Sequence, residues 1–211
     1  SEYVLWRKTE SAGYGISLRD GIQWNKEKLD MKRLGITYGN DNTGDLYTDN
    51  APWFVDWVKR SNVDGVDLCM ADGGFNVDEK EEKQEFLTSH LILAEILVGI
   101  GATKPGGSFV VKVYDTVTSI SADLLYLLAL SFDLICLFKP ISSRPANSER
   151  YVVCLGRRDN VVDPLRIATN AHQAMSNGSM AENIVYSRDP RFDEWLTTQN
   201  NFHAESQIAA G

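Results

Sequence analysis

The order in which apolar segments recur along the chain restricts its fold more than any other feature. Short runs with strand character cover residues 13–18, 65–74, 106–115, 134–140 and 151–157, and longer helical patterns separate most of them. Such alternation is typical of parallel strands joined by crossover helices. The last two runs are joined by a polar loop too short for a crossover, which predicts an antiparallel pair. The sequence therefore predicts an α/β fold with a doubly wound, mostly parallel Rossmann-like sheet, one antiparallel strand, and helices on both faces.

The helical patterns divide the chain into a main domain and an extension. Helices are predicted over residues 2–8, 51–61, 79–101 and 121–132, the last capped by Ser119 or Ser121. After about Asp159 the pattern weakens, and 189–210 predicts one or two helices. We therefore expect a domain over 1–158 and a helical extension over 159–211 that packs on the same domain.

The charge balance limits the classes of partner. Lys and Arg number 21 and Asp and Glu 29, a net charge of −8. This argues against non-specific coating of nucleic acid, which requires many phosphate neutralisations. A local exception lies between Ile135 and Arg158, where five basic residues accompany Glu149 alone: Lys139, Arg144, Arg150, Arg157 and Arg158. An ordinary solvated surface is the alternative, but this concentration favours an anionic ligand.

Cysteine and histidine usage predicts no metal site. Cys69, Cys136 and Cys154 lie in apolar strand-like runs, so we expect buried free thiols in a reducing compartment. The three histidines are scattered along the sequence. No apolar run approaches the ~20 residues that span a bilayer, and no secretory signal is visible, so no membrane partner is expected.

Three ionisable residues lie at the ends of predicted strands. Asp72 follows one strand and precedes two glycines, at the sheet edge where α/β folds bind ligands. Lys112 lies within an apolar strand, where a lysine costs energy unless it is paired or needed for chemistry. Glu149 directly precedes the last strand. A turn cap, a snorkelling lysine and a surface salt bridge are the structural alternatives. Together the three positions predict an active site.

The segments "MADGGF", "GGSFVVKVYD" and "LFKPISSRPANSERYVVC" resemble the FtsJ-like ribose 2′-O-methyltransferases. The resemblance is closest to the cap-specific mRNA enzymes, which methylate the first transcribed nucleotide. "SEYVLWRK", "FDEWLTTQNN" and "SQIAA" extend it over essentially the whole chain. It implies S-adenosylmethionine as methyl donor, S-adenosylhomocysteine as product, capped mRNA as substrate and no metal.

The same resemblance assigns catalytic and donor-binding residues. The family uses a Lys-Asp-Lys-Glu tetrad, of which Asp72, Lys112 and Glu149 are the last three members here, with Lys112 directed at the ribose 2′-hydroxyl. Asp45 in "NTGDLY", Asp72 and Gly73 are the implied donor-binding residues. A lysine that acts as a base needs a lowered pKa, whereas neighbouring carboxylates raise it. The sequence leaves this balance open.

The loop before the last strand supplies the predicted RNA contacts. The resemblance of "LFKPISSRPANSERY" places Lys139, Arg144, Asn147 and Ser148 against the substrate RNA.

In this family a strand and a glycine-rich loop precede the helix that begins "SEYVLWRK", and the first tetrad lysine lies further upstream. The 211 residues contain neither. We therefore expect a gap in the sheet and a larger polypeptide, with capping or transcription machinery as further partners. The expected compartment is the nucleus for a cellular protein and the cytoplasm for a viral one.

Two alternatives stay open. One is a catalytically inactive methyltransferase-like domain that binds RNA or protein, and the other is a 2′-O-methyltransferase of ribosomal or transfer RNA. The intact Asp72, Lys112 and Glu149 favour an enzyme, because an inactive copy has no chemical reason to keep a buried lysine.

Overall fold

The computed structural model describes residues 2–20, 24–25, 27, 29–74, 84–144, 147–179 and 183–210. The chain forms α1 (Glu2–Arg7), β1 (Gly13–Ile16), β2 (Leu34–Thr37), α2 (Asn50–Ser61), β3 (Val66–Ala71), α3 (Gln84–Ala102), β4 (Thr103–Val113), α4 (Ser119–Ser131), β5 (Phe132–Phe138), β6 (Arg150–Arg157), α5 (Val162–Ser176) and α6 (Pro190–Ala210). The predicted helix over 79–101 corresponds to α3, and its first five residues lie outside the described ranges. The periodicity does not single out β2, which is only four residues long.

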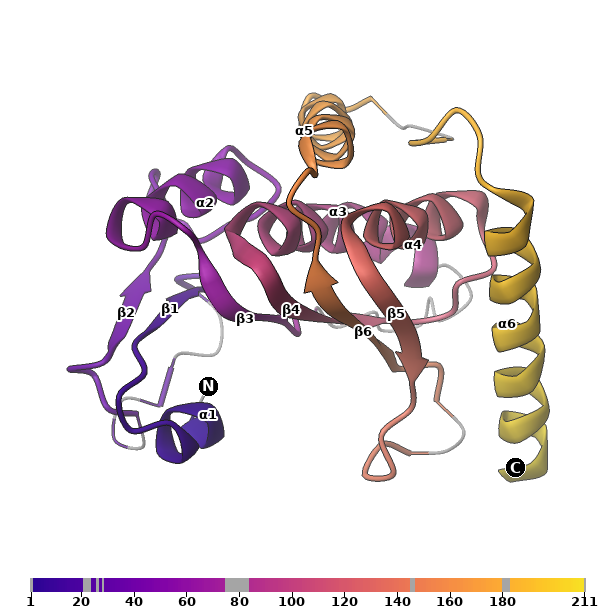
Figure 1. Cartoon of the computed structure of the whole chain (residues 1–211), viewed down its shortest axis with the longest axis horizontal. Helices are drawn as coiled ribbons and strands as arrows, with labels where there is room; N and C mark the ends of the chain where they lie inside the picture. Colours follow the sequence, from indigo (N-terminus) through magenta and orange to yellow (C-terminus); the bar gives the residue numbers. More distant parts are fainter. Residues whose placement is uncertain are drawn as a thin grey trace.

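The strands form two sheets. One has the order β3-β4-β6-β5, in which β3 and β4 are parallel and β6 runs antiparallel to both of its neighbours. The prediction of a mostly parallel sheet with one antiparallel strand is therefore confirmed. β1 and β2 form a separate parallel pair. Figure 1 shows this pair beside the β3 edge, and no ladder within the described part of the chain joins the two sheets. The sequence predicts a gap in the sheet, and the described strands form two separate sheets.

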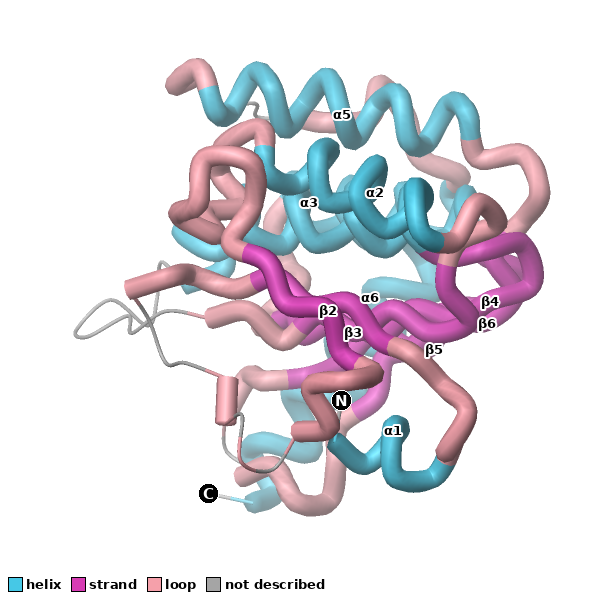
Figure 2. Tube along the Cα trace, turned by 90° about the vertical axis from the view of Figure 1, so that its left-hand side faces the viewer, coloured by secondary structure: helices cyan, strands magenta, loops and turns pink. Residues whose placement is uncertain are grey.

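One face of the four-stranded sheet carries the core. Figures 1 and 2 show α2, α3 and α4 over this face, with α5 outside α3. Because α3 lies between the sheet and other helices, it is apolar on nearly all sides, and Leu93, Ile96 and Ile100 are fully buried. Phe109 of β4 and Phe132 of β5 stack beneath the helices, with ring centroids 6.3 Å apart.

The opposite face of the same sheet is partly open. Figure 2 shows α1 on this side of the strands, away from α3 and α5. Five large apolar side chains are 37–56% exposed here: Leu68, Met70, Leu134, Phe138 and Leu155. Cys136 is exposed among them, which corrects the prediction of a buried thiol. Strand side chains alternate between faces, so an apolar sequence run does not tell which residues are covered.

The start of α4 differs from the prediction. Thr118, rather than Ser119 or Ser121, is the N-cap, and its hydroxyl oxygen accepts a hydrogen bond from the Ser121 N–H at 3.3 Å. Ser119 is already the first helical residue.

The last two helices pack on the rest of the chain. His172 of α5 lies against His90 of α3, with 3.2 Å between the facing ring nitrogens. The Phe192 ring of α6 packs at a tilt against the Tyr126 ring of α4, with ring centroids 5.0 Å apart. The division into a domain and an extension stays a prediction, but these contacts give the extension a common core with the sheet and its helices. None of the described helices is long and apolar enough to cross a membrane.

Candidate active site

Asp72 and Lys112 meet at the carboxyl ends of β3 and β4. These strands are parallel neighbours, and their pairing places Ala71 beside Val111, so the two residues that follow come together. The Lys112 ammonium lies 2.8 Å from Asp72 Oδ1 and donates to the Asp72 carbonyl at 3.2 Å. Only 12% of the Lys112 side chain is exposed, against 67% of Asp72. The pair therefore presents an open carboxylate in front of a largely covered cation.

The protonation state of Lys112 follows from competing effects. Burial alone would lower its pKa, but the hydrogen bond to Asp72 and the fields of Tyr114, Asp72 and Tyr151 outweigh burial, and the pKa is raised. Lys112 is therefore an ammonium at neutral pH. In the balance that the sequence left open, the acid and the two tyrosines therefore outweigh burial.

The glycines after Asp72 let the backbone come close to buried side chains. The Gly73 N–H donates to Glu95 Oε1 of α3 at 2.8 Å. A Cβ at Gly73 would lie 2.5 Å from the same oxygen, and a Cβ at Gly74 would lie 3.2 Å from Lys112 Nζ. Glycine therefore permits this approach at Gly73 without displacing the Glu95 carboxylate, and it leaves room beside the lysine at Gly74.

Tyr151 connects the third predicted acid to this pair. It lies opposite Lys112 in the β4–β6 ladder, and its hydroxyl donates to Asp72 Oδ1 at 3.4 Å. Burial raises the pKa of Tyr151, and Asp72 and Glu149 add to the increase. Glu149 is thus within electrostatic range of Tyr151, yet no hydrogen bond or ion pair joins it to Lys112 in the described part of the chain. Sequence reasoning missed Tyr151, although its place two residues after Glu149 puts it on the same strand end.

Glu149 belongs to a loop that is held together from inside. Its Oε1 accepts from the Ser143 hydroxyl at 3.3 Å. Lys139 donates to the Asn147 carbonyl at 2.6 Å, to the Asn147 side-chain oxygen, and to the Glu149 carbonyl at 2.9 Å. Burial lowers the pKa of Lys139. Two of the predicted RNA contacts, Lys139 and Asn147, are therefore engaged in ordering the loop.

The other two predicted RNA contacts differ in exposure. Arg144 is exposed, and its carbonyl accepts from the Asn147 N–H at 3.2 Å. Ser148 is half-buried beside Glu149.

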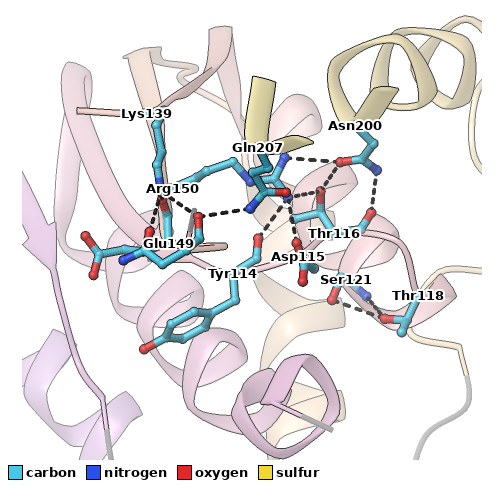
Figure 3. Close-up of polar contacts among 11 residues, drawn as sticks. Tyr114, Asp115, Thr116, Thr118, Ser121, Lys139, Glu149, Arg150, Asn200 and Gln207 are labelled. Carbon is cyan, nitrogen blue, oxygen red and sulfur yellow. Dashed lines mark hydrogen bonds and ion pairs between the residues drawn. The ribbon is translucent and has the colours of Figure 1, made fainter. Parts of the chain in front are cut away.

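A buried arginine at the base of this loop joins β4, β6 and α6. Arg150 is 4% exposed, and one terminal nitrogen donates to the Tyr114 carbonyl at 3.0 Å and to the Thr116 hydroxyl at 3.3 Å. Its other terminal nitrogen donates to Asn200 Oδ1 of α6 at 3.3 Å. Gln207, two turns further along α6, donates to the Asn147 carbonyl at 3.0 Å. Figure 3 shows this network, with the Glu149 carboxylate on the side away from Asn200.

Most of the basic residues predicted to form a surface are buried or paired with other groups of the protein. Arg150 is buried, and Arg157 donates to the Ile100 carbonyl at 3.2 Å, with its pKa lowered by burial. Arg158 lies 3.4 Å from Asp133. Counting charges in the sequence overestimates what a ligand can reach, because half of the strand residues face inward.

Asp45 lies in a compact turn between β2 and α2. Its Oδ1 accepts from the Tyr47 N–H at 2.8 Å, which is the turn chemistry expected of this segment. The buried Asn50 organises the turn from below, donating to Asp41 Oδ1 at 2.8 Å and to the Asp45 carbonyl at 3.0 Å. Gly44 has a φ of +74°, and a Cβ there would lie 1.8 Å from the Ser17 carbonyl oxygen. Sequence reasoning missed Asn50.

Two histidines that are scattered in sequence form a pair beneath this turn. His172 Nε2 lies 3.0 Å from the Thr48 carbonyl, so it donates there and leaves its Nδ1 free to accept from His90. The His90 ring also packs on Tyr47, with 4.6 Å between ring centroids. Burial, with His172 beside it, lowers the pKa of His90. The pair links the segment around the Asp45 turn to α3 and α5.

The residues at this sheet edge include one acid that a ligand can reach. The Asp72 carboxylate is 67% exposed and can accept hydrogen bonds from hydroxyl or ammonium groups of a ligand. No group of three potential metal-ligating side chains occurs among the residues that the structure describes. A separate surface depression of about 510 Å³ on α2, lined by Trp53, Asp56, Lys59 and Arg60, includes none of the strand-end residues.

Comparison with known protein families identifies the class of protein to which the chain belongs. Residues 1–157 match the model of the FtsJ-like methyltransferases, which places the chain among the methyltransferases. The chain belongs to the FtsJ-like methyltransferase family. This agrees with the fold and with the Asp72–Lys112 pair at the strand ends.

Curated relatives match the chain over its full length. The cap-specific mRNA (nucleoside-2′-O-)-methyltransferase 1 of Xenopus laevis is 36% identical over 228 residues, and that of Homo sapiens is 37% identical over 228 residues. Both alignments cover 100% of this chain and 27% of the relative. The Dictyostelium discoideum protein of the same name is 34% identical over 237 residues, covering 100% of this chain and 31% of the relative. The chain therefore spans less than a third of the length of these curated relatives.

Proposed function

We propose that the protein transfers a methyl group from S-adenosylmethionine to the ribose 2′-hydroxyl of the first transcribed nucleotide of capped mRNA. The observation that carries the proposal is the largely buried Lys112 paired with Asp72 at the carboxyl ends of adjacent parallel strands. The relatives named above support the substrate, since their names specify the mRNA cap and the 2′-oxygen.

The chemistry requires an oxygen nucleophile placed in line with an electrophilic methyl group. S-adenosylmethionine supplies that methyl group on a positively charged sulfur. The bond from the 2′-oxygen to the methyl carbon forms as the carbon–sulfur bond breaks, the electron pair of that bond stays on sulfur, and the hydroxyl proton passes to solvent water. Lys112, as an ammonium, donates to the 2′-oxygen and stabilises the negative charge that develops on it. Asp72 fixes the ammonium, so that most of the rate gain comes from position and electrostatics.

The proposed roles of the remaining residues follow their positions. Asp45 and the Gly73 backbone bind the donor, and Asp72 contributes to the same site. Glu149 acts through Tyr151, whose pKa it helps to raise. Arg144 is exposed and contacts a phosphate, while Lys139, Asn147 and Ser148 shape the loop that receives the RNA.

The first test is calorimetric titration of the 211-residue chain and of the full-length protein with S-adenosylmethionine. We expect the full-length protein to bind and to methylate a capped RNA but not the same RNA with a 2′-deoxy first nucleotide. Binding without transfer to any RNA would favour an inactive RNA- or protein-binding domain. Transfer to ribosomal or transfer RNA in preference to capped RNA would replace the proposed substrate.

A further inference from the structure

Glu95 is a buried acid that the proposed mechanism does not use. It is the only charged residue between Thr88 and Ala102, a stretch of α3 that is otherwise largely apolar. Its neighbours Ala94 and Ile96 are fully buried, and Glu95 itself is 5% exposed. An acid at such a position is costly, because its ionised form is removed from water.

Glu95 accepts a hydrogen bond from the backbone that follows β3. Its Oε1 accepts the Gly73 N–H at 2.8 Å, so the acid reaches from α3 to the residue directly after Asp72. A Cβ at Gly73 would come within 2.5 Å of this oxygen, so a larger residue there would displace the Glu95 carboxylate. One carboxylate therefore fixes the height of the Asp72–Gly73 backbone above α3.

The charges around Glu95 come from several elements. Lys112 of β4 favours its ionised form, whereas Asp72 opposes it. Tyr47, before α2, and Cys69 of β3 both respond to the Glu95 charge. Burial dominates these effects and raises the pKa of Glu95 to about 7. The carboxyl group thus changes its charge near neutral pH.

The effect of Glu95 on stability favours a functional reason for its presence. An acid whose pKa is raised in the folded state adds stability below its unfolded value of 4.5, and that stability is lost as the pH rises through about 7. At neutral pH the fold would be more stable with an uncharged residue in this place. Costs of this kind are characteristic of residues kept for activity.

Building on the proposed function, we propose that Glu95 is a positioning residue for methyl-donor binding, which acts by holding the Gly73 amide. The ionised carboxylate accepts this hydrogen bond more strongly than the neutral acid. Donor affinity is therefore expected to increase as the pH rises from 6 to 8, with Glu95 as the group responsible.

The test compares three variants of the full-length protein by titration with S-adenosylmethionine at pH 6 and pH 8. Glu95→Leu removes the acceptor, Glu95→Gln keeps an acceptor oxygen without a charge, and Glu194→Gln removes an exposed acid of α6 as a matched control. We expect about tenfold weaker donor binding for Glu95→Leu with an unchanged or higher Tm at pH 8. For Glu95→Gln we expect the wild-type Kd at pH 6 and no gain at pH 8. A purely structural role would lower Tm and leave Kd unchanged in both variants, which would overturn the proposal.

A second readout does not depend on donor binding or methyl transfer. The Gly73 amide resonance should shift with pH in the wild-type protein, with a midpoint near 7, and should not shift in Glu95→Gln. If the wild-type protein fails to bind the donor, the proposed function fails, and this resonance still decides whether Glu95 controls the loop. A resonance that is insensitive to pH overturns the inference.

Discussion

The Asp72 corner (Asp72, Gly73, Gly74 and Lys112) and the Glu149 loop (residues 139–149) carry the two halves of the proposed catalytic set, and they are built differently. The register of β3 and β4 assembles the Asp72 corner, and α3 supports it from below. The Glu149 loop depends on side chains that bind backbone carbonyls, including Gln207 from α6. α6 lies beyond residues 1–157, which match the family model. Strand register therefore brings the lysine and the first acid together, whereas the loop that carries the second acid is held in part by a helix of the extension.

The largest effect should come from the centre of the Asp72 corner. Lys112→Ala removes the cation at the reacting oxygen, so we expect methyl transfer to fall by about 10³-fold with less than about threefold change in donor Kd. Lys104→Ala is the matched control, because Lys104 lies at the other end of the same strand and pairs with Asp67 at 2.7 Å. It should leave both values unchanged. An equal loss of transfer and donor binding in Lys112→Ala would make Lys112 a structural residue.

Stability should depend most on the base of the Glu149 loop. Arg150→Met leaves the Tyr114 carbonyl and the Thr116 hydroxyl without this charged donor, and it removes the link to Asn200. We expect the free energy of unfolding to fall by about 3 kcal/mol in denaturant titrations. Arg158→Met breaks a solvent-exposed pair and should cost less than about 1 kcal/mol. Equal losses of unfolding free energy in the two variants would mean that the buried hydrogen bonds of Arg150 contribute no more to stability than an exposed ion pair.

Glu95, which supports the Asp72 corner, should make the free energy of unfolding depend on pH. Glu95 contributes stability below pH 4.5 that is lost as the pH rises through about 7. The difference is up to about 3 kcal/mol, because 7 − 4.5 corresponds to 2.5 pKa units. Relative to wild type, Glu95→Gln should therefore gain stability at pH 8 compared with pH 5, as followed by denaturant midpoints. Parallel pH curves for the two proteins would contradict the raised pKa.

The smallest effect is expected where α6 reaches the loop. Gln207→Ala removes one neutral hydrogen bond to the Asn147 carbonyl, which should cost about 1 kcal/mol or less of unfolding free energy. We expect methyl transfer to fall several-fold through kcat, with donor Kd unchanged. Glu205→Ala, on the exposed side of the same helix, provides the control. Unchanged kcat would show that α6 supports the fold but not the position of Glu149.

Much of the fold was accessible from the sequence because its signals are local. Alternating strand and helix patterns predicted β1, β3 to β6 and α1 to α4, and loop length predicted the antiparallel pair. The cap of α4 was missed by one residue, since Thr118, Ser119 and Ser121 all have hydroxyls that can serve. The exposure of Cys136 was also missed, because an apolar run does not tell which face of a sheet is covered.

The sequence by itself determined that Asp72 and Lys112 would meet, because both end parallel strands and a lysine in an apolar strand needs a partner. Tertiary structure alone decided that Lys112 is an ammonium, that Lys139 turns inward to the Glu149 loop, and that His90 and His172 pair. It also placed Glu95 under Gly73. These partners are 10 to 82 residues apart. Periodicity reports which side of an element is apolar, but the partner of a buried polar group depends on how whole elements pack.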